Sequence, residues 1–186
     1  VVMVNFTDDA SQPITAAAAS SRVFGEVSDF YWENSYQKTF LSGDTFGWTT
    51  APMTKAECRW SKVVDAGNQA MLAAGKNPAD YQHFIYFFPA ASGCQNVAGN
   101  QKGTNGELRV FLNGTPTFAS MTIAHEMAHT LGLLHSDALD CDRSPIGDTC
   151  TAINYGDPSD VMGADGHFNA YWKERLGWLG TTGMPA

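Results

Sequence analysis

Residues 125–135 read HEMAHTLGLLH, and they hold three of the five histidines in this chain of 186 residues. His125 and His129 are four positions apart, so an α-helix would place them one turn apart on the same face. Two imidazoles in that arrangement can reach one zinc ion at about 2.0–2.1 Å. A helix that continued would carry His135 about 15 Å along its axis and point it elsewhere. The spacing therefore predicts a helix that stops between His129 and His135.

Gly132 is the residue that allows this stop, because glycine adopts left-handed backbone angles without a Cβ penalty and commonly ends helices. We expect a turn after it that brings His135 back to the same ion. Leu131, Leu133 and Leu134 are expected to anchor that turn in the core.

Glu126 follows His125 directly, so its carboxylate lies next to the two-histidine face without being at ligand spacing. Three protein ligands leave a fourth position for water, and zinc lowers the pKa of that water to about 7. A neighbouring carboxylate can take the proton and pass it to the leaving amine of a cut peptide bond. The pattern predicts His125, His129 and His135 as zinc ligands and Glu126 as general base and then acid. One alternative to this interpretation is an HExxH sequence that arose by chance on an amphipathic helix. Another is a structural zinc site, although such a site usually has four protein ligands, often cysteines.

The sequence around this motif resembles the metzincin clan of zinc endopeptidases. That clan has a methionine turn downstream, whose methionine lies beneath the histidines, and Met162 in the run DVMG fits this role. The longer run YGDPSDVMG at residues 155–163 and the ending FNAYWKERLGWL at residues 168–179 are similar to the gametolysin-like branch. This likeness covers roughly residues 120–179. Met162 would otherwise be ordinary core filler.

The chain departs from some metzincins at two positions. Certain branches have a tyrosine two residues after the turn methionine as an extra metal ligand, whereas this chain has Ala164. We therefore expect no tyrosine ligand there, and the sequence names no side chain that would stabilise the oxyanion. Ser136 follows His135, with Asp137 next, which argues against branches that place aspartate directly after the third histidine.

The resemblance implies an α+β, zincin-like catalytic domain with a twisted mixed sheet of about five strands and three main helices. We expect one domain over residues 1–186, with a sheet-bearing upper part over about 1–132. The lower part, about 133–186, should be mostly irregular and carry the third ligand, the methionine turn and a closing helix. Hydrophobic periodicity predicts strands and helices in the following ranges. The strands are 1–6, two paired segments within 38–49, 83–88 and 107–112; the helices are 14–36, 55–74, one starting near Ser120 as a possible N-cap, and 169–179.

The segment 91–106 is rich in glycine and asparagine, and a simple loop is its plainest interpretation. The resemblance instead implies an edge strand beside the cleft, to which an extended substrate adds by main-chain hydrogen bonds. The residues expected to contact substrate are Val97, Ala98, Gly99 and Asn100 on that edge, with Gly163 and Ala164 beyond the cut bond. His83 and His167 are expected to have structural roles.

The charge and the cysteine content of the chain limit which partners it can bind and in which cellular compartment it is expected to work. The net charge of −8 and pI of about 4.9 disfavour a nucleic-acid partner, and no run has the length of a membrane-spanning helix. The four cysteines allow three pairings, of which Cys141–Cys150 is favoured, followed by Cys58–Cys94, with four buried free thiols as the alternative. Disulfides would place the protein outside the cell. The start at Val1 without Met suggests a processed chain.

The sequence thus predicts a secreted, monomeric zinc endopeptidase that cleaves extended protein segments and that, by resemblance, is made with a propeptide. Calcium is undecided, because no stretch has the spacing of a calcium-binding EF-hand loop. One rival is a binding or adhesion module that keeps zinc without cleaving, and another is a zinc amidase that acts on a cell-wall substrate. Glu126 counts against the first rival, since losing that carboxylate is the simplest route to inactivity. The sequence does not give the cleavage-site preference.

Overall fold

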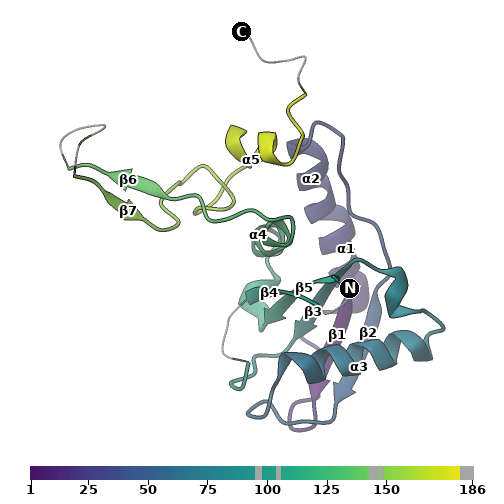
Figure 1. Ribbon diagram of the computed structural model, residues 1–186. Coiled ribbons are helices and arrows are strands. Elements are labelled where there is room, and N and C mark those ends of the chain that lie inside the picture. The colour runs from purple at the N-terminus through teal and green to yellow at the C-terminus, as the bar shows by residue number, and fades with distance from the viewer. Residues whose placement is uncertain (95–97, 104–105, 143–146, 148, 181–186) are drawn as a thin grey trace.

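The computed structural model describes residues 1–94, 98–103, 106–142, 147 and 149–180 (Figure 1). The strands are β1 (Val2–Phe6), β2 (Phe46–Ala51), β3 (His83–Phe88), β4 (Ala98–Lys102), β5 (Leu108–Asn113), β6 (Ala138–Asp140) and β7 (Thr151–Ile153). The helices are α1 (Ala16–Ser21), η1 (Arg22–Val27), α2 (Ser28–Asn34), α3 (Trp60–Ala73), η2 (Pro78–Asp80), η3 (Thr115–Phe118), α4 (Ser120–Thr130) and α5 (Ala170–Arg175).

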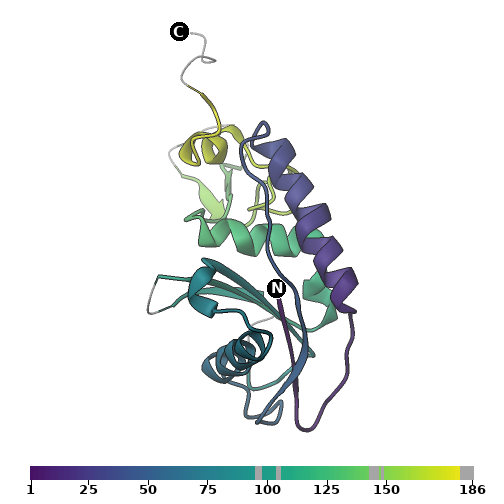
Figure 2. The same cartoon turned by 90° about the vertical axis from the view of Figure 1, so that its right-hand side faces the viewer.

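Five strands form one twisted sheet in the order β2-β1-β3-β5-β4. The first four run parallel, and β4 pairs antiparallel with β5 at the edge. Three long helical segments pack on this sheet: the α1-η1-α2 run, α3 and α4, with α3 on the opposite face from the other two (Figure 2). The predicted mixed sheet of about five strands with three main helices is therefore confirmed.

Both faces of the sheet are buried, and side chains alternate between two hydrophobic clusters as the strand pleat requires. In β3, Phe84, Tyr86 and Phe88 belong to the cluster under α3, whereas Ile85 and Phe87 face the cluster under α4 and the long helix. This explains why β3 reads as an almost continuous apolar run. The sheet thus gives α4, which carries the motif, a rigid floor.

The helix predicted over 14–36 is one continuous rod, but its middle third, η1, is a π-helix that includes Gly25 (Figure 2). Thr15 caps its start by accepting a hydrogen bond from the Ala18 N–H at 3.1 Å. On the far side, the Tyr31 hydroxyl donates to the Ala124 carbonyl of α4 at 2.9 Å. The rod therefore fixes the position of the motif helix.

The paired strands predicted within 38–49 are wrong, since only Phe46–Ala51 forms a strand and it pairs with β1. The segment before this strand is bound by two serine hydroxyls, one in α2 and one directly after it. Ser35 accepts from the Thr39 N–H at 2.8 Å, and Ser28 accepts from the Leu41 N–H at 3.0 Å. These bonds satisfy two backbone N–H groups of the segment and hold it along the helix.

Helix boundaries differ from expectation in three places. α3 begins at Trp60 rather than near residue 55, and α5 ends at Arg175. Ser120 opens α4 but is not its N-cap: Ala119 holds that position, and the Ser120 hydroxyl donates to Glu26 instead. The N-cap prediction for Ser120 is therefore wrong, because a partner on the neighbouring helix takes its side chain.

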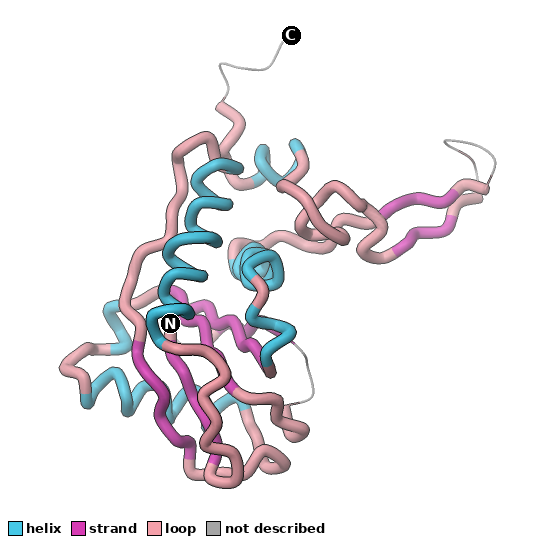
Figure 3. The backbone as a smooth tube through the Cα atoms, turned by 180° about the vertical axis from the view of Figure 1, so that it is seen from behind, coloured by secondary structure: helices cyan, strands magenta, loops and turns pink. Residues whose placement is uncertain are grey.

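The described residues of the lower part are mostly irregular, as predicted, but they include a hairpin that the sequence did not reveal. β6 and β7 pair antiparallel, with Ala138 opposite Ile153, and form an arm that projects away from the rest of the molecule (Figures 1 and 3). The predicted disulfide Cys141–Cys150 joins its two sides. None of the described helices is long and apolar enough to cross a membrane.

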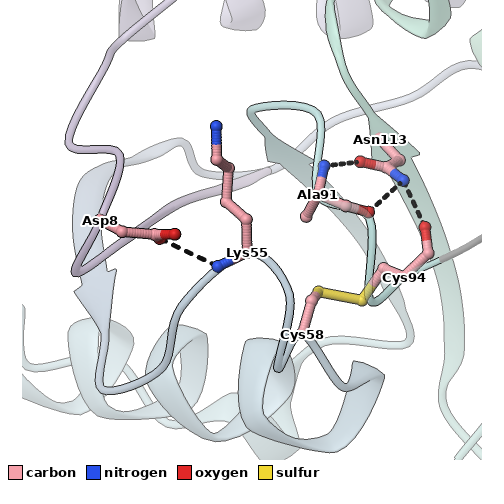
Figure 4. Close-up of a disulfide and its surroundings, with 6 residues drawn as sticks. All are labelled: Asp8, Lys55, Cys58, Ala91, Cys94 and Asn113. Carbon is pink, nitrogen blue, oxygen red and sulfur yellow. Dashed lines mark hydrogen bonds between the residues drawn. A yellow bond between two sulfur atoms is a disulfide. The ribbon is translucent and has the colours of Figure 1, made fainter.

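The second predicted disulfide, Cys58–Cys94, ties the chain before α3 to the loop after β3 (Figure 4). Asn113, at the end of β5, binds the same loop with its side chain. Its Oδ1 accepts from the Ala91 N–H at 2.8 Å, while its Nδ2 donates to the carbonyls of Ala91 and Cys94. The chain that leads toward β4 is therefore fastened from two sides.

Candidate active site

The motif helix α4 has two distinct faces. Ile123, Ala124, Met127 and Ala128 are buried against the sheet and the long helix. The opposite, half-buried face presents His125, Glu126 and His129. The four buried apolar residues repeat at helical spacing and therefore occupy one face of α4. The two histidines and the glutamate consequently lie on the opposite, more open face.

The helix stops where Gly132 requires it to stop. Gly132 has a φ of +89°, in the left-handed region, and the Leu133 N–H donates back to the Ala128 carbonyl at 3.2 Å. Leu133 is buried and anchors the turn, whereas Leu131 and Leu134 are 37% and 72% exposed. The predicted stop is confirmed, and only one of the three leucines expected in the core lies there.

The turn brings His135 beside the two helical histidines. The Nε2 atoms of His125 and His129 lie 3.1 Å apart, and the His135 ring centroid lies 5.4 Å and 4.9 Å from theirs. One nitrogen from each of the three rings lies within 4.8 Å of the others, so the group could hold a metal ion. The spacing argument made from residues 125–135 therefore predicted a real cluster.

Each of these histidines has its other ring nitrogen bound to an oxygen. The Nδ1 of His125 donates to the Val161 carbonyl at 2.7 Å, and that of His129 to the Leu133 carbonyl at 2.8 Å. The Nδ1 of His135 donates to Oδ1 of Asn154 at 3.2 Å. These bonds place the ring proton on Nδ1 and leave the Nε2 lone pairs for a cation. Three imidazole nitrogens arranged in this way form a ligand set that suits zinc.

A buried turn that contacts His125 through the Val161 carbonyl contains the predicted methionine. Met162 is fully buried in the cluster that also holds Met127 and Ala128. Its N–H donates to Oδ1 of buried Asp160 at 2.6 Å, and its carbonyl accepts from the Ser136 N–H at 2.9 Å. The turn is thereby joined to the segment that carries His135.

A family model of known proteins matches most of this sequence. The model for Gametolysin peptidase M11 covers residues 7–183. The chain belongs to the gametolysin family. Members of this family are zinc metalloendopeptidases, so the chain is an enzyme of that class, and the branch resemblance read from residues 155–179 is confirmed. No curated protein matches the chain.

The edge strand expected in a gametolysin-family peptidase is present. Ala98, Gly99 and Asn100 lie in β4, which has β5 on one side and, among the described strands, no neighbour on the other. Val97 lies outside the described residues. α4 packs against both β4 and β5, so the edge runs beside the motif helix.

Gly163 and Ala164 follow the turn methionine and differ in setting. Gly163 is buried, and a Cβ there would lie 2.1 Å from the Asp157 carbonyl oxygen, so only glycine fits. Ala164 is exposed, and its N–H donates to the same carbonyl at 2.9 Å. The position two residues after Met162 therefore offers only a methyl group, as the sequence indicated.

Tyr155 is the residue at this gametolysin-family site that sequence reasoning missed. Its ring centroid lies 3.7 Å from that of His135 and 5.8 Å from that of His125. Partial burial raises the pKa of the Tyr155 phenol, and the negative charge of Glu126 raises it further. Its signal in the sequence was weak, because it was one letter in the branch-like run 155–163.

Proposed function

We propose that this gametolysin-family peptidase binds one zinc ion through Nε2 of His125, His129 and His135, and that Glu126 moves the protons of peptide-bond hydrolysis. The observation that carries the proposal is the convergence of the three rings while each Nδ1 is held by a separate oxygen. Oxygen partners of this kind orient metal-binding histidines and favour the correct tautomer.

Bound zinc would supply a Lewis acid that acidifies water and polarises the carbonyl of the bond to be cut. Glu126 lies next to His125 on the half-buried face of α4. From there its carboxylate accepts the proton of the attacking water and then delivers it to the leaving amide nitrogen. Met162 and the buried turn around it support the histidines from below, because the Val161 carbonyl holds the His125 ring.

The substrate in this proposal is an extended segment of a protein or peptide, cut internally. An extended chain can add to the outer edge of β4, along Ala98, Gly99 and Asn100, by main-chain hydrogen bonds. Small residues on this edge allow the substrate backbone to approach closely. Gly163 and Ala164 would line the pocket beyond the cut bond.

We propose that the enzyme works outside the cell. Two disulfides support this, because such bonds persist in oxidising compartments. The proposed enzyme is a monomer, and its resemblance to the metzincins implies that it is made with a propeptide.

The test combines metal analysis with one substitution. Purified protein should hold about one zinc per chain, release it to a chelator, and cleave casein only when zinc is present. Glu126→Ala should retain zinc while its cleavage rate falls about 10³-fold, because the attacking water loses its base. Glu174→Ala on α5 is the matched control and should behave as wild type.

Three results would contradict this mechanism. Cleavage by Glu126→Ala at the wild-type rate would exclude the proposed proton transfer. Wild-type protein that holds zinc but leaves casein and a peptide library uncut would support a binding module. Selective hydrolysis of cell-wall peptides over proteins would support the amidase.

A further inference from the structure

Tyr155 lies in contact with the histidine cluster but has no role in the chemistry described above. Its ring rests on His135 at a centroid distance of 3.7 Å, with 34° between the planes. It is also nearly parallel to the ring of His125 at 5.8 Å. The phenol therefore belongs to the side of the cluster formed by these two histidines.

A tight turn between β7 and the methionine turn holds Tyr155 in this place. Its φ is +59°, a left-handed conformation that a bulky residue seldom adopts and that recurs at active sites. The Tyr155 N–H donates to Oδ1 of Asp137 at 3.1 Å, and Asn154 beside it binds His135. Gly156 packs so closely on Ala138 that a Cβ would lie 2.5 Å from it. The ring is therefore fixed against the residue that would bind zinc.

The side chain is also open to a substrate. Tyr155 is 43% exposed, unlike a tyrosine that serves as core filler. Its ring lies 5.8 Å from that of His125, the residue directly before Glu126 on α4. An exposed tyrosine ring therefore lies beside the helical turn that carries the proposed general base.

Hydrolysis at such a site places negative charge on the carbonyl oxygen of the bond that is cut. Fixed hydrogen-bond donors aimed at this oxygen accelerate acyl transfer. Ala164 offers no donor from the methionine turn. A phenol is a hydrogen-bond donor on a rigid ring, and Tyr155 brings one to the site from the opposite end of the run 155–163.

We propose that Tyr155 is a catalytic residue whose phenol O–H donates a hydrogen bond to the carbonyl oxygen of the scissile peptide as charge develops there. This inference rests on the proposed function. It gives the enzyme an oxyanion donor that the sequence alone did not supply. It also gives a reason for the left-handed turn and for the exposure of an aromatic ring beside three histidines.

Two substitutions separate the hydroxyl from the ring. Tyr155→Phe keeps the ring on His135 and removes only the donor, whereas Tyr155→Ala removes both. Tyr171→Phe, at a tyrosine 55% exposed on α5, is the control for loss of an exposed phenol. Zinc affinity is measured by competition with a coloured chelator. Rates are measured on a peptide that wild-type enzyme cuts from casein, and binding is measured for the phosphinic analogue of that peptide, whose tetrahedral centre resembles the transition state.

For Tyr155→Phe we expect unchanged zinc affinity and KM, with kcat lower by about 10²–10³-fold. Affinity for the phosphinic analogue should fall by a similar factor, while affinity for the cleaved product should not change. Tyr155→Ala should lose zinc affinity as well, and Tyr171→Phe should match wild type. Wild-type kcat and analogue affinity in Tyr155→Phe would show that the ring is only a support for His135. A loss of zinc affinity in Tyr155→Phe would make the phenol a metal ligand, and either result overturns the proposal.

The two proposals fail in different ways. If wild-type enzyme holds no zinc, or if Glu126→Ala cleaves normally, the proposed function itself is wrong. If cleavage requires zinc and Glu126 while Tyr155→Phe remains fully active, only the role of Tyr155 is wrong.

Discussion

The Nδ1 atom of His125 donates a hydrogen bond of 2.7 Å to the carbonyl oxygen of Val161, the residue immediately before Met162. This contact joins the motif helix to the methionine turn across 36 positions of the chain. The orientation of the His125 ring, a proposed metal ligand, therefore depends on a backbone oxygen. The position of that oxygen depends in turn on the contacts that hold the methionine turn. Groups that bind the ligands of a metal commonly change its affinity 10- to 100-fold when altered.

Asp160 holds this turn, so Asp160→Asn should weaken zinc binding without touching a ligand. The carboxylate is fully buried and accepts from the N–H groups of Met162 at 2.6 Å and Asn169 at 2.8 Å. An amide of the same shape would turn one acceptor into a donor that faces an N–H. We expect a loss of about 2–3 kcal/mol in unfolding free energy and a fall of about 10-fold in zinc affinity, measured by urea denaturation and chelator competition.

Asp165→Asn is the matched control, because Asp165 is exposed in the same lower part and accepts only from Gly166 among the hydrogen bonds found. It should change neither quantity. Equal zinc affinities in wild type and Asp160→Asn would show that the turn does not position His125.

Gly132→Ala tests whether the helix stop positions the third histidine. Gly132 has a φ of +89° with open space around its Cα, so alanine there is strained without a clash. The expected cost is about 1–2 kcal/mol, together with weaker zinc binding, because relief of the strain would displace His135. Gly75→Ala is a close match, with a φ of +74° and equally open space after α3. It should lose similar stability and keep its zinc affinity, and a zinc affinity unaffected by Gly132→Ala would contradict this argument.

The parts of the site that the sequence predicted are those set by local spacing. His125, His129 and Gly132 follow from helical geometry alone, and the apolar run 83–88 shows that a strand is buried on both faces. The disulfides followed from proximity in the chain and the even number of cysteines. These features depend little on how distant segments meet.

The missed parts depend on distant contacts. Every residue has a carbonyl, so no letter marks those of Val161 and Leu133 as partners of histidines. The alternation of aromatic residues within 38–49 resembled paired strands, yet hydroxyls of Ser28 and Ser35 took the backbone bonds that a strand needs. Tyr155 lies at the site on a left-handed turn, and its N–H donates to Asp137. Hydrophobic periodicity can show neither of these features.

The two disulfides should differ in what they protect. Cys58–Cys94 closes 36 positions and should contribute about 4 kcal/mol, whereas Cys141–Cys150 closes 9 and should contribute about 2.5 kcal/mol. Replacing the first pair by alanine should also raise KM for long peptides, since that pair fastens the chain leading toward β4. Replacing the second pair should leave zinc affinity unchanged, because His135 is held by Asn154 outside the disulfide loop. Zinc loss in the second variant would contradict this division, and calorimetry with peptide kinetics measures both effects.

His83 should make stability depend on pH below neutrality. Burial lowers the pKa of its imidazole below the usual 6.5, and its Nδ1 lies 3.4 Å from the Thr130 hydroxyl at the end of α4. As pH falls through about 6.5 the unfolded chain binds a proton that the folded protein binds only at lower pH, so unfolding becomes easier. Stability from the neutral imidazole is therefore fully present above about pH 7 and is lost progressively toward the folded pKa. The unfolding free energy of wild type relative to His83→Gln should decrease from pH 7 to pH 5. Both proteins are measured without zinc, so that the three clustered histidines contribute equally to the two curves. Parallel curves over that range would show that His83 titrates alike in both states.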